Sequence, residues 1–293
     1  MLTLTFLGVG GAFAKRNYQS NVLLEAWRQG PQQQPAPDET LLIDFGTTGP
    51  LALHDLKDRP EFEYLRNGGQ VDYRRIRNVL ITHLHADHVG GLEELALMNT
   101  YVLGSSVNQP PFRPRLISSA DILRGVWDES LRGGLGVMHG RPARLEDYFE
   151  PVTLIPADPR GNRIPLTDRY RLEVVRTRHV TLEAGGDWPS VGVRLIDTRS
   201  RRSVFYTGDT QFNVDGYGPW MEEAELCFHD VQLTDALGSV HALLSELRTL
   251  PESIRRKMVL YHFGDDWDAA EYGVVSREFA GFAVPQRRYD LFP

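Results

Sequence analysis

The chain has 293 residues, of which 41% are hydrophobic and 24% are charged, as in an ordinary globular protein that can bury a substantial core. Its formal net charge of −7 argues against a protein whose main task is to grip long nucleic acid by its phosphates. The single cysteine, Cys227, excludes an internal disulfide and is typical of a reducing compartment.

The N-terminal segment 1–7 alternates like a β-strand and lacks the basic start and long apolar run of a signal peptide. No segment approaches the roughly 20 consecutive apolar residues of a membrane-spanning helix. We therefore expect a cytoplasmic protein with no membrane partner.

The first third of the chain reads as a series of strands, predicted at 2–8, 21–26, 40–45 and 76–82. The second and third should pair as a hairpin, because the Gln- and Pro-rich stretch 28–38 between them predicts an exposed loop. Gly8-Val9-Gly10-Gly11 lacks the later glycine and the acidic partner of a dinucleotide fingerprint, so it predicts a tight turn. A helix should open at 51–56, and the apolar spacing of 92–103 predicts another.

The strand at 76–82 leads directly into four metal-binding side chains within six residues: His83, His85, Asp87 and His88. In an extended chain, residues two apart point the same way, so His83 and His85 can bind one ion together. Asp87 and His88 follow where the chain bends, so they point elsewhere and suit a second ion. Imidazole and carboxylate are ligands that catalytic zinc prefers, and packing alone rarely places so many polar groups at one strand end.

The second half of the chain predicts more strands, at 171–175, 191–196, 203–206 and 257–261. Helices are predicted at 120–131, ending at Gly133-Gly134, and, as a long helix, at 241–250. We expect one domain spanning 1–293, with an insertion or lid-like segment at about 104–170. Alternating strands and helices favour sheets flanked by helices.

Three more polar residues each follow a predicted strand: His179, Asp209 and His262. Taken singly, each has an ordinary alternative as a buried hydrogen-bonding group or a turn residue. Together with the cluster at 83–88 they form a complete ligand set, which packing alone does not explain.

In this order, the motif His83-x-His85-x-Asp87-His88 and the residues His179, Asp209 and His262 resemble the metallo-β-lactamase superfamily. The resemblance covers nearly the whole chain and implies an α/β fold, the four-layer αββα metallo-β-lactamase sandwich. It implies two divalent ions, expected to be Zn²⁺ with Mn²⁺ as the alternative. One ion would be held by His83, His85 and His179, the other by Asp87, His88 and His262, with Asp209 bridging both.

Two ions about 3.5–4 Å apart lower the pKa of a shared water, so a bridging hydroxide would attack phosphorus or a carbonyl carbon. The Asp209 bridge and the final histidine are unlike true β-lactamases and resemble the phosphodiesterase branch that includes ribonuclease Z. The resemblance to this branch implies that Asp87, His241 and Asp230 are catalytic. His241 would donate a proton to the leaving oxygen, and Asp230 would orient His241. The match departs from the usual pattern, since Asp230 replaces a glutamate and Val240-His241 replaces a His-Ser-Thr motif. The alternative is that Ser239 caps a helix and His241 lies in its first turn.

Ribonuclease Z of the common bacterial type carries a long basic arm between the third histidine and the bridging aspartate. Here only 29 residues, 180–208, separate His179 from Asp209. The sequence therefore favours a small phosphodiester, above all a 3′,5′-cyclic nucleotide, and it resembles cyclic-nucleotide phosphodiesterases of phages and bacteria, including the anti-Pycsar type. The resemblance also implies a homodimer, in which the apolar face of 92–103 is a candidate seam.

Three alternatives remain open: processing of transfer RNA 3′ ends, hydrolysis of a carboxylic ester or lactone, and binding of metal or nucleotide without catalysis.

Overall fold

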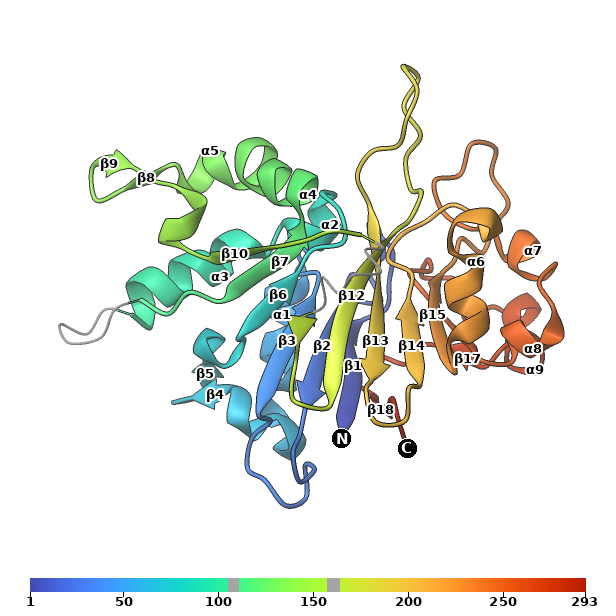
Figure 1. Cartoon of the computed structure of the whole chain (residues 1–293), viewed down its shortest axis with the longest axis horizontal. Coiled ribbons are helices and arrows are strands. Elements are labelled where there is room, and N and C mark those ends of the chain that lie inside the picture. The colour runs from blue at the N-terminus through green and yellow to red at the C-terminus, as the bar shows by residue number, and fades with distance from the viewer. Residues whose placement is uncertain (105–110, 157–163) are drawn as a thin grey trace.

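The computed structural model describes residues 1–104, 111–156 and 164–293, and its strands form two large sheets that face each other (Figure 1). The first sheet contains, in spatial order, β10 (Glu150–Leu154), β7 (Arg115–Ser119), β6 (Asn78–Leu80), β3 (Glu39–Ile43), β2 (Asn21–Ala26), β1 (Leu2–Gly8) and β18 (Arg288–Asp290). The second contains β11 (Ile164–Pro165), β12 (Tyr170–Arg176), β13 (Val191–Asp197), β14 (Ser203–Tyr206), β15 (Leu226–Asp230), β16 (Met258–Tyr261) and β17 (Gly281–Phe282). Two short hairpins, β4–β5 (Arg66–Asn67, Gln70–Val71) and β8–β9 (Val137–Met138, Arg141–Pro142), lie outside them.

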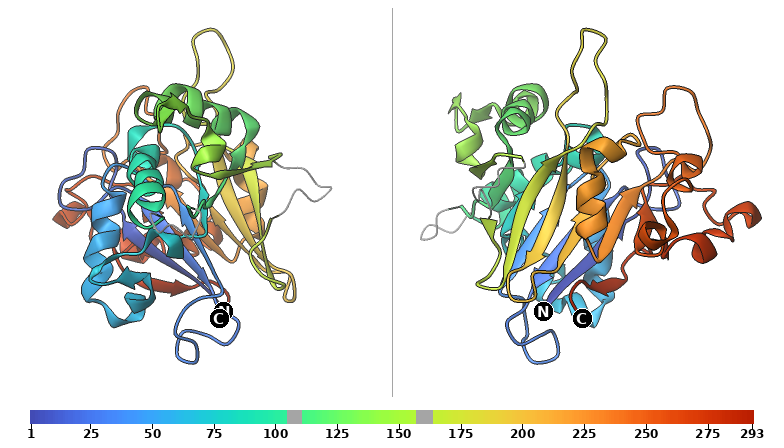
Figure 2. Two further views of the ribbon diagram at one scale, coloured as in Figure 1. Left: turned by 90° about the vertical axis from the view of Figure 1, so that its left-hand side faces the viewer. Right: turned by 45° about the vertical axis from the view of Figure 1, so that its right-hand side comes forward.

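Helices lie beside the outer faces of both sheets (Figure 2). Beside the first sheet are α1 (Gly49–His54), α2 (Ala86–Val89), α3 (Leu92–Leu97), α4 (Ala120–Gly125) and α5 (Arg132–Leu135). Beside the second are α6 (Val214–Glu223), α7 (Leu244–Leu247), α8 (Glu252–Arg255) and α9 (Val275–Glu278). The remaining turns are 3₁₀ at η1 (Asp55–Asp58), η2 (Pro60–Leu65), η3 (Tyr73–Arg75), η6 (Leu145–Asp147) and η7 (Ala270–Tyr272), and π-helical at η4 (Met98–Val102) and η5 (Val126–Leu131).

Aromatic side chains fill the space between the two sheets. The ring of Phe6 in β1 lies 5.4 Å from that of Phe228 in β15 and 5.5 Å from that of Tyr261 in β16. Tyr206 in β14 stacks on Tyr261 at 4.7 Å. All of these side chains are fully buried, so the interior between the sheets is the hydrophobic core. The helix–sheet–sheet–helix layering confirms the predicted αββα sandwich.

The strand directions bring several chain segments to one edge of the sandwich. β3, β6 and β7 are mutually parallel in the first sheet, and β14, β15 and β16 are parallel in the second. Parallel strands end at the same edge, which is where polar groups following each strand meet. Both chain termini lie at the opposite end of the molecule (Figure 1).

Two helix predictions differ from the structure. The helix predicted at 120–131 does not end at Gly133-Gly134 but continues through them as α4, η5 and α5 to Leu135. The long helix predicted at 241–250 is wrong, since α7 spans only Leu244–Leu247. Gln232 hydrogen-bonds through its backbone to Ala242 and Leu244, and this pairing holds the chain extended where the helix was expected.

The segment at 104–170 contributes β7 and β10 to the first sheet, with β7 paired to β6. Part of it is therefore integral to the sandwich, while residues 105–110 and 157–163 lie outside the described residues. The single-domain boundaries and a lid role for this segment stay predictions. Within the described parts, no helix is both long and apolar enough to cross a membrane.

Candidate metal centre

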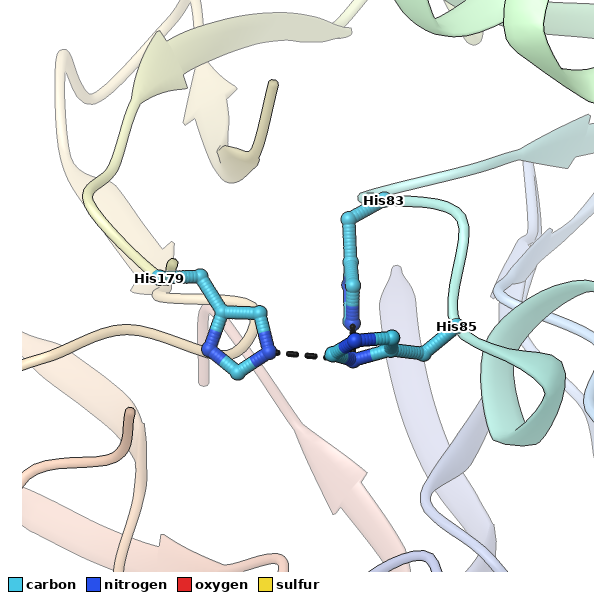
Figure 3. A group of neighbouring side chains, drawn as sticks. All are labelled: His83, His85 and His179. Carbon is cyan, nitrogen blue, oxygen red and sulfur yellow. Dashed lines mark hydrogen bonds between the residues drawn. The ribbon is translucent and has the colours of Figure 1, made fainter. Parts of the chain in front are cut away.

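Three imidazoles converge at the shared sheet edge (Figure 3). His83 and His85 follow β6, and His179 follows β12 in the second sheet. The Nδ1 atom of His85 lies 3.0 Å from Nε2 of His83 and 3.1 Å from Nε2 of His179. One nitrogen of each ring thus points into a common space, as ligands of a single ion would.

A second group lies directly beside the first. Nε2 of His88 is 3.2 Å from carboxylate oxygens of both Asp87 and Asp209. Nε2 of His262, which follows β16, is 3.3 Å from Asp87 and 3.1 Å from Asp209. These four side chains are buried and offer ligand atoms within 4.8 Å of one another.

Asp209 links the two groups. Its Oδ2 atom contacts the second group and also lies 3.9 Å from Nε2 of His83 in the first. The structure therefore brings together all seven side chains that the sequence singled out as ligands, with the Asp209 carboxylate between the two groups.

Two buried polar atoms at this centre lie near other polar groups without forming a hydrogen bond of good geometry. Nε2 of His88 and Oδ1 of Asp209 are buried and make no hydrogen bond to the described residues. Burying such atoms unpaired is costly unless something else satisfies them. A donor set of imidazole nitrogens and carboxylate oxygens suits zinc or a similar divalent ion, so the residues fit the expected metals.

Second hydrogen bonds orient several of the rings. Nδ1 of His88 lies 2.8 Å from Asp44, and Nδ1 of His83 lies 3.1 Å from the Thr82 hydroxyl. That hydroxyl in turn donates to Asp44 at 2.8 Å. His179 is held through Nδ1 by the carbonyl oxygen of Val240 at 2.8 Å. Such partners fix which nitrogen of an imidazole is free to bind metal.

Asp44 was not among the predicted site residues, although it carries the same signal as the others. It follows the buried strand β3 directly and is itself fully buried. Its φ of 61° and that of His262, 64°, lie in the left-handed region that residues other than glycine rarely adopt. Strained backbone of this kind is concentrated at functional sites.

The electrostatic environment gives most ligands the protonation state that a metal requires. Burial lowers the pKa of His83 well below its usual value and that of His179 to about 4, so both imidazoles are neutral at pH 7. Burial alone would raise the pKa of Asp87 and Asp209. The charges of His88 and His262 outweigh it and hold both pKa values below the usual range, so both carboxylates are ionised.

His241 and Asp230 form a pair at the side of the centre. Nδ1 of His241 lies 2.9 Å from Asp230, which also accepts a hydrogen bond from the backbone of Thr210. Burial alone would lower the pKa of His241, but its hydrogen bond to Asp230 and the charge of Asp209 raise it above the usual value. Its ring lies 5.0 Å from that of His179 and 4.7 Å from that of His262.

The alternative in which Ser239 caps a helix that contains His241 is wrong, because α7 begins only at Leu244 with Leu243 as its N-cap. Instead, the Ser239 hydroxyl accepts a hydrogen bond from the backbone of His241 at 3.0 Å and donates to Gln232 at 2.8 Å. Ser239 thereby helps to hold the loop that carries His241.

A cavity of about 500 Å³ opens beside His241 and His262. Its other walls are the loop segments 11–14, 231–234 and 264–266. Phe13 stands at this cavity with 90% of its surface exposed. Exposed aromatic residues on loops beside a polar centre are typical of ligand contacts.

Comparisons with known proteins cover nearly the whole chain. The family model described as Anti-Pycsar protein Apyc1 matches residues 2–289. The chain is 34% identical over 283 residues to Anti-Pycsar protein Apyc1 of Paenibacillus sp. (strain J14), covering 95% of this chain and 96% of that protein. It is also 34% identical over 273 residues to the protein of the same name from Bacillus phage vB_BsuM-Goe3, covering 90% and 89%. The structure of unliganded yeast PDE1 shares the fold, with a TM-score of 0.69 at 13% identity over 98% of this chain and 99% of that one.

Proposed function

The chain belongs to the family of Anti-Pycsar protein Apyc1 and is a metal-dependent hydrolase of the phosphodiesterase type, and on this premise we propose that it hydrolyses 3′,5′-cyclic nucleotides. The observation that carries the proposal is the pair of ligand groups joined by Asp209 beside the His241–Asp230 pair. That combination supplies both charge neutralisation and a proton donor, the two requirements for breaking a phosphodiester.

In this proposal His83, His85 and His179 hold one divalent ion, while Asp87, His88 and His262 hold a second, and Asp209 contacts both. Zinc is the first candidate, with manganese as the alternative. When bound, two such ions lower the pKa of a water they share and neutralise the charge of the phosphate.

His241 would donate a proton to the leaving oxygen. Its raised pKa favours the protonated imidazole needed for this step at neutral pH. The hydrogen bond to Asp230 holds Nδ1, which leaves Nε2 to face the substrate. Asp230 is buried and ionised because the hydrogen bonds and charges of His229 and His241 lower its pKa against the effect of burial.

The cavity beside His241 and His262 would receive the nucleoside part of the substrate. Its volume of about 500 Å³ is within the roughly 300–1,000 Å³ range of small-molecule sites. Between His179 and Asp209 the chain forms a short hairpin followed by β13 and β14, which supports a small substrate over a transfer RNA clamped by a long arm.

A direct test incubates the purified protein, loaded with Zn²⁺ or Mn²⁺, with the 3′,5′-cyclic monophosphates of adenosine, guanosine, cytidine and uridine. We expect release of the nucleoside monophosphates, measured by liquid chromatography. The Asp209→Asn variant, prepared identically, controls for a contaminating phosphodiesterase. Precursor transfer RNA and a panel of esters and lactones run in parallel, and turnover of one of these with no cleavage of any cyclic nucleotide would overturn the proposal.

We also propose that the protein is a homodimer. Leu51 and Val102, each 54% exposed, and the partly exposed Tyr101 border adjoining surface hollows around α1, α3 and η4. Exposed apolar side chains gathered in this way are typical of association surfaces. Light scattering after size exclusion should give twice the chain mass, and Leu51→Asp should reduce it to the monomer.

A further inference from the structure

His85 differs from its neighbours in how its ring is held. His83, His88 and His179 each use their second nitrogen for a hydrogen bond to the protein. His85 turns Nδ1 toward the other imidazoles, and its Nε2 has no hydrogen-bond partner among the described residues. In the described part of the chain, no protein group therefore fixes the His85 ring by a hydrogen bond, as protein groups do for the other three imidazoles.

The indole of Trp188 packs against the His85 ring instead. Their centroids lie 4.8 Å apart with the planes inclined at 48°, and the indole is also 6.1 Å from the His83 ring. Aromatic rings at this separation attract each other through dispersion and electrostatics. Trp188 thus limits how far the His85 ring can rotate or tilt.

Trp188 does not act as a core residue. Trp27 is buried in the protein interior, and Trp127, Trp220 and Trp267 pack against the hydrophobic core, whereas Trp188 is half-buried and outside it. In the described part of the chain, the aromatic rings that pair with the indole are imidazoles of the metal centre. Packing of the interior therefore does not explain a tryptophan here.

The backbone around Trp188 is well fixed, although it lies in a hairpin, residues 177–190, that projects from the sandwich (Figure 2). The amide of Trp188 donates to the Val180 carbonyl at 2.8 Å, and Arg178 pairs with Asp187 at 3.2 Å. The same hairpin delivers His179 on its first strand and Trp188 on its second. One element thus places both a ligand and the ring that contacts another ligand.

We propose that Trp188 is a positioning residue that holds the His85 imidazole in its metal-binding orientation by ring contact, in place of a hydrogen bond. The inference rests on the proposed role of His85 as a ligand. A ring contact of this kind contributes about 2- to 10-fold to an equilibrium constant. Loss of the indole should therefore weaken binding of the ion held by His83, His85 and His179.

The test measures metal binding without substrate, in the full-length protein. Metal-free parent, Trp188→Ala and Trp188→Phe proteins are titrated with Zn²⁺ against a chromophoric chelator, and with Co²⁺ while the visible absorption of the bound ion is recorded. We expect Trp188→Ala to lose about 2- to 10-fold in affinity at one site and to alter the cobalt spectrum. Trp188→Phe, which keeps an aromatic face, should retain most of the parent affinity.

Trp220→Ala is the matched control, because Trp220 packs against the core away from the centre and should alter stability but not metal affinity. Circular dichroism of each metal-free protein checks folding, and Trp188→Leu replaces the alanine variant if that variant does not fold. If Trp188→Ala binds metal with the affinity and cobalt spectrum of the parent, the inference is overturned. The same holds if the only change in this variant is a higher KM for a nucleotide, because the indole would then act on the substrate and not on His85. A parent protein that binds no metal would instead refute the proposed function.

Discussion

At the scale of single residues, the centre depends on close backbone approaches as much as on its ligands. Gly46 follows Asp44 and lies against the backbone of α2, which carries Asp87 and His88. A Cβ atom at Gly46 would come within 1.7 Å of the Asp87 carbonyl oxygen, a distance that requires the backbone to move.

Gly46→Ala should therefore displace the segment that carries Asp87. We expect a loss of stability at the upper end of the about 1–3 kcal/mol typical of overpacking, together with weaker metal binding. Chemical denaturation and zinc titration measure the two effects. Gly133→Ala is the matched control, since a Cβ atom at Gly133 meets nothing within 4 Å. Equal stability of the two variants would contradict the prediction.

The His241–Asp230 pair makes a kinetic prediction. His241→Ala should lower kcat for a cyclic nucleotide by about 100- to 10,000-fold, the usual contribution of a general acid, with little change in KM. Asp230→Asn keeps the shape but weakens the orienting hydrogen bond, so its kcat should fall less. Steady-state kinetics with metal content measured on each variant distinguish lost catalysis from lost metal. A fully active His241→Ala enzyme would favour the ester or lactone alternative, whose leaving group does not need this donor.

At the scale of elements, the loop between β1 and β2 is tied to the chain that follows β16. The backbone of His262 donates to Val9, and Asp265 accepts hydrogen bonds from the backbone amides of Lys15 and Arg16. Arg16 also makes a double hydrogen bond to Asp268. These contacts hold Phe13 at the cavity beside His241 and His262.

Phe13→Ala should raise KM for cyclic nucleotides and leave kcat close to that of the parent. Stacking of a base on an aromatic ring contributes about 1–3 kcal/mol, so we expect KM to rise about 5-fold or more. A cyclic ribose phosphate without a base is the control substrate, because it has nothing to stack and its KM should be the same in both proteins. An equal rise in KM for both substrates would show that Phe13 acts on the loop rather than on the base.

A buried ion pair joins β2, β18 and η2 on the outer face of the first sheet. Glu25 is fully buried and accepts hydrogen bonds from Arg288 at 2.9 Å, Tyr64 at 2.8 Å and Thr3 at 3.2 Å. Burial raises the pKa of Glu25 in spite of Arg288, so the carboxylate depends on that partner.

Arg288→Met should cost about 3–5 kcal/mol in the free energy of unfolding, the usual effect of leaving a buried charge unpaired. A carboxyl with a raised pKa in the folded state binds more protons there than when unfolded, so stability is lost as the pH rises through that pKa. The loss of unfolding free energy caused by Arg288→Met should accordingly be larger at pH 8, where ionised Glu25 needs its partner, than at pH 5. Urea unfolding at both pH values measures it, with the exposed neighbour Arg287→Met as control. A cost independent of pH would contradict the role assigned to the Glu25 charge.

At the scale of the whole molecule, the centre connects the two sheets. His83, His85, Asp87 and His88 come from the first sheet, whereas His179, Asp209 and His262 come from the second. Ions bound between ligands from the two sheets would stabilise the folded state but not the unfolded chain.

Removing metal should therefore lower the melting temperature. An ion present at 100 times its Kd contributes about 2.7 kcal/mol, which corresponds to a shift of several degrees in a domain of this size. Differential scanning calorimetry before and after dialysis against a chelator gives the value, and adding back zinc should restore it. In Asp209→Asn the shift should be smaller, because that variant lacks the shared ligand. An identical melting temperature with and without metal would contradict the binding of ions between the two sheets.

The sequence alone determined the fold class, the family resemblance and the identity of the residues that meet at the sheet edge. These are local properties, since strand periodicity and a polar residue directly after a buried strand can be read from a few neighbouring positions. Tertiary structure decided what surrounds those residues. Asp44 follows a buried strand as the ligands do, but only the folded chain shows that it contacts His88, 44 positions away. Trp188 contacts His85 across 103 positions, and no local pattern in the sequence indicates that contact. The helix expected at 241–250 failed for the same reason: pairing with Gln232 overrides the helical preference of that segment, and only the folded chain brings Gln232 beside it.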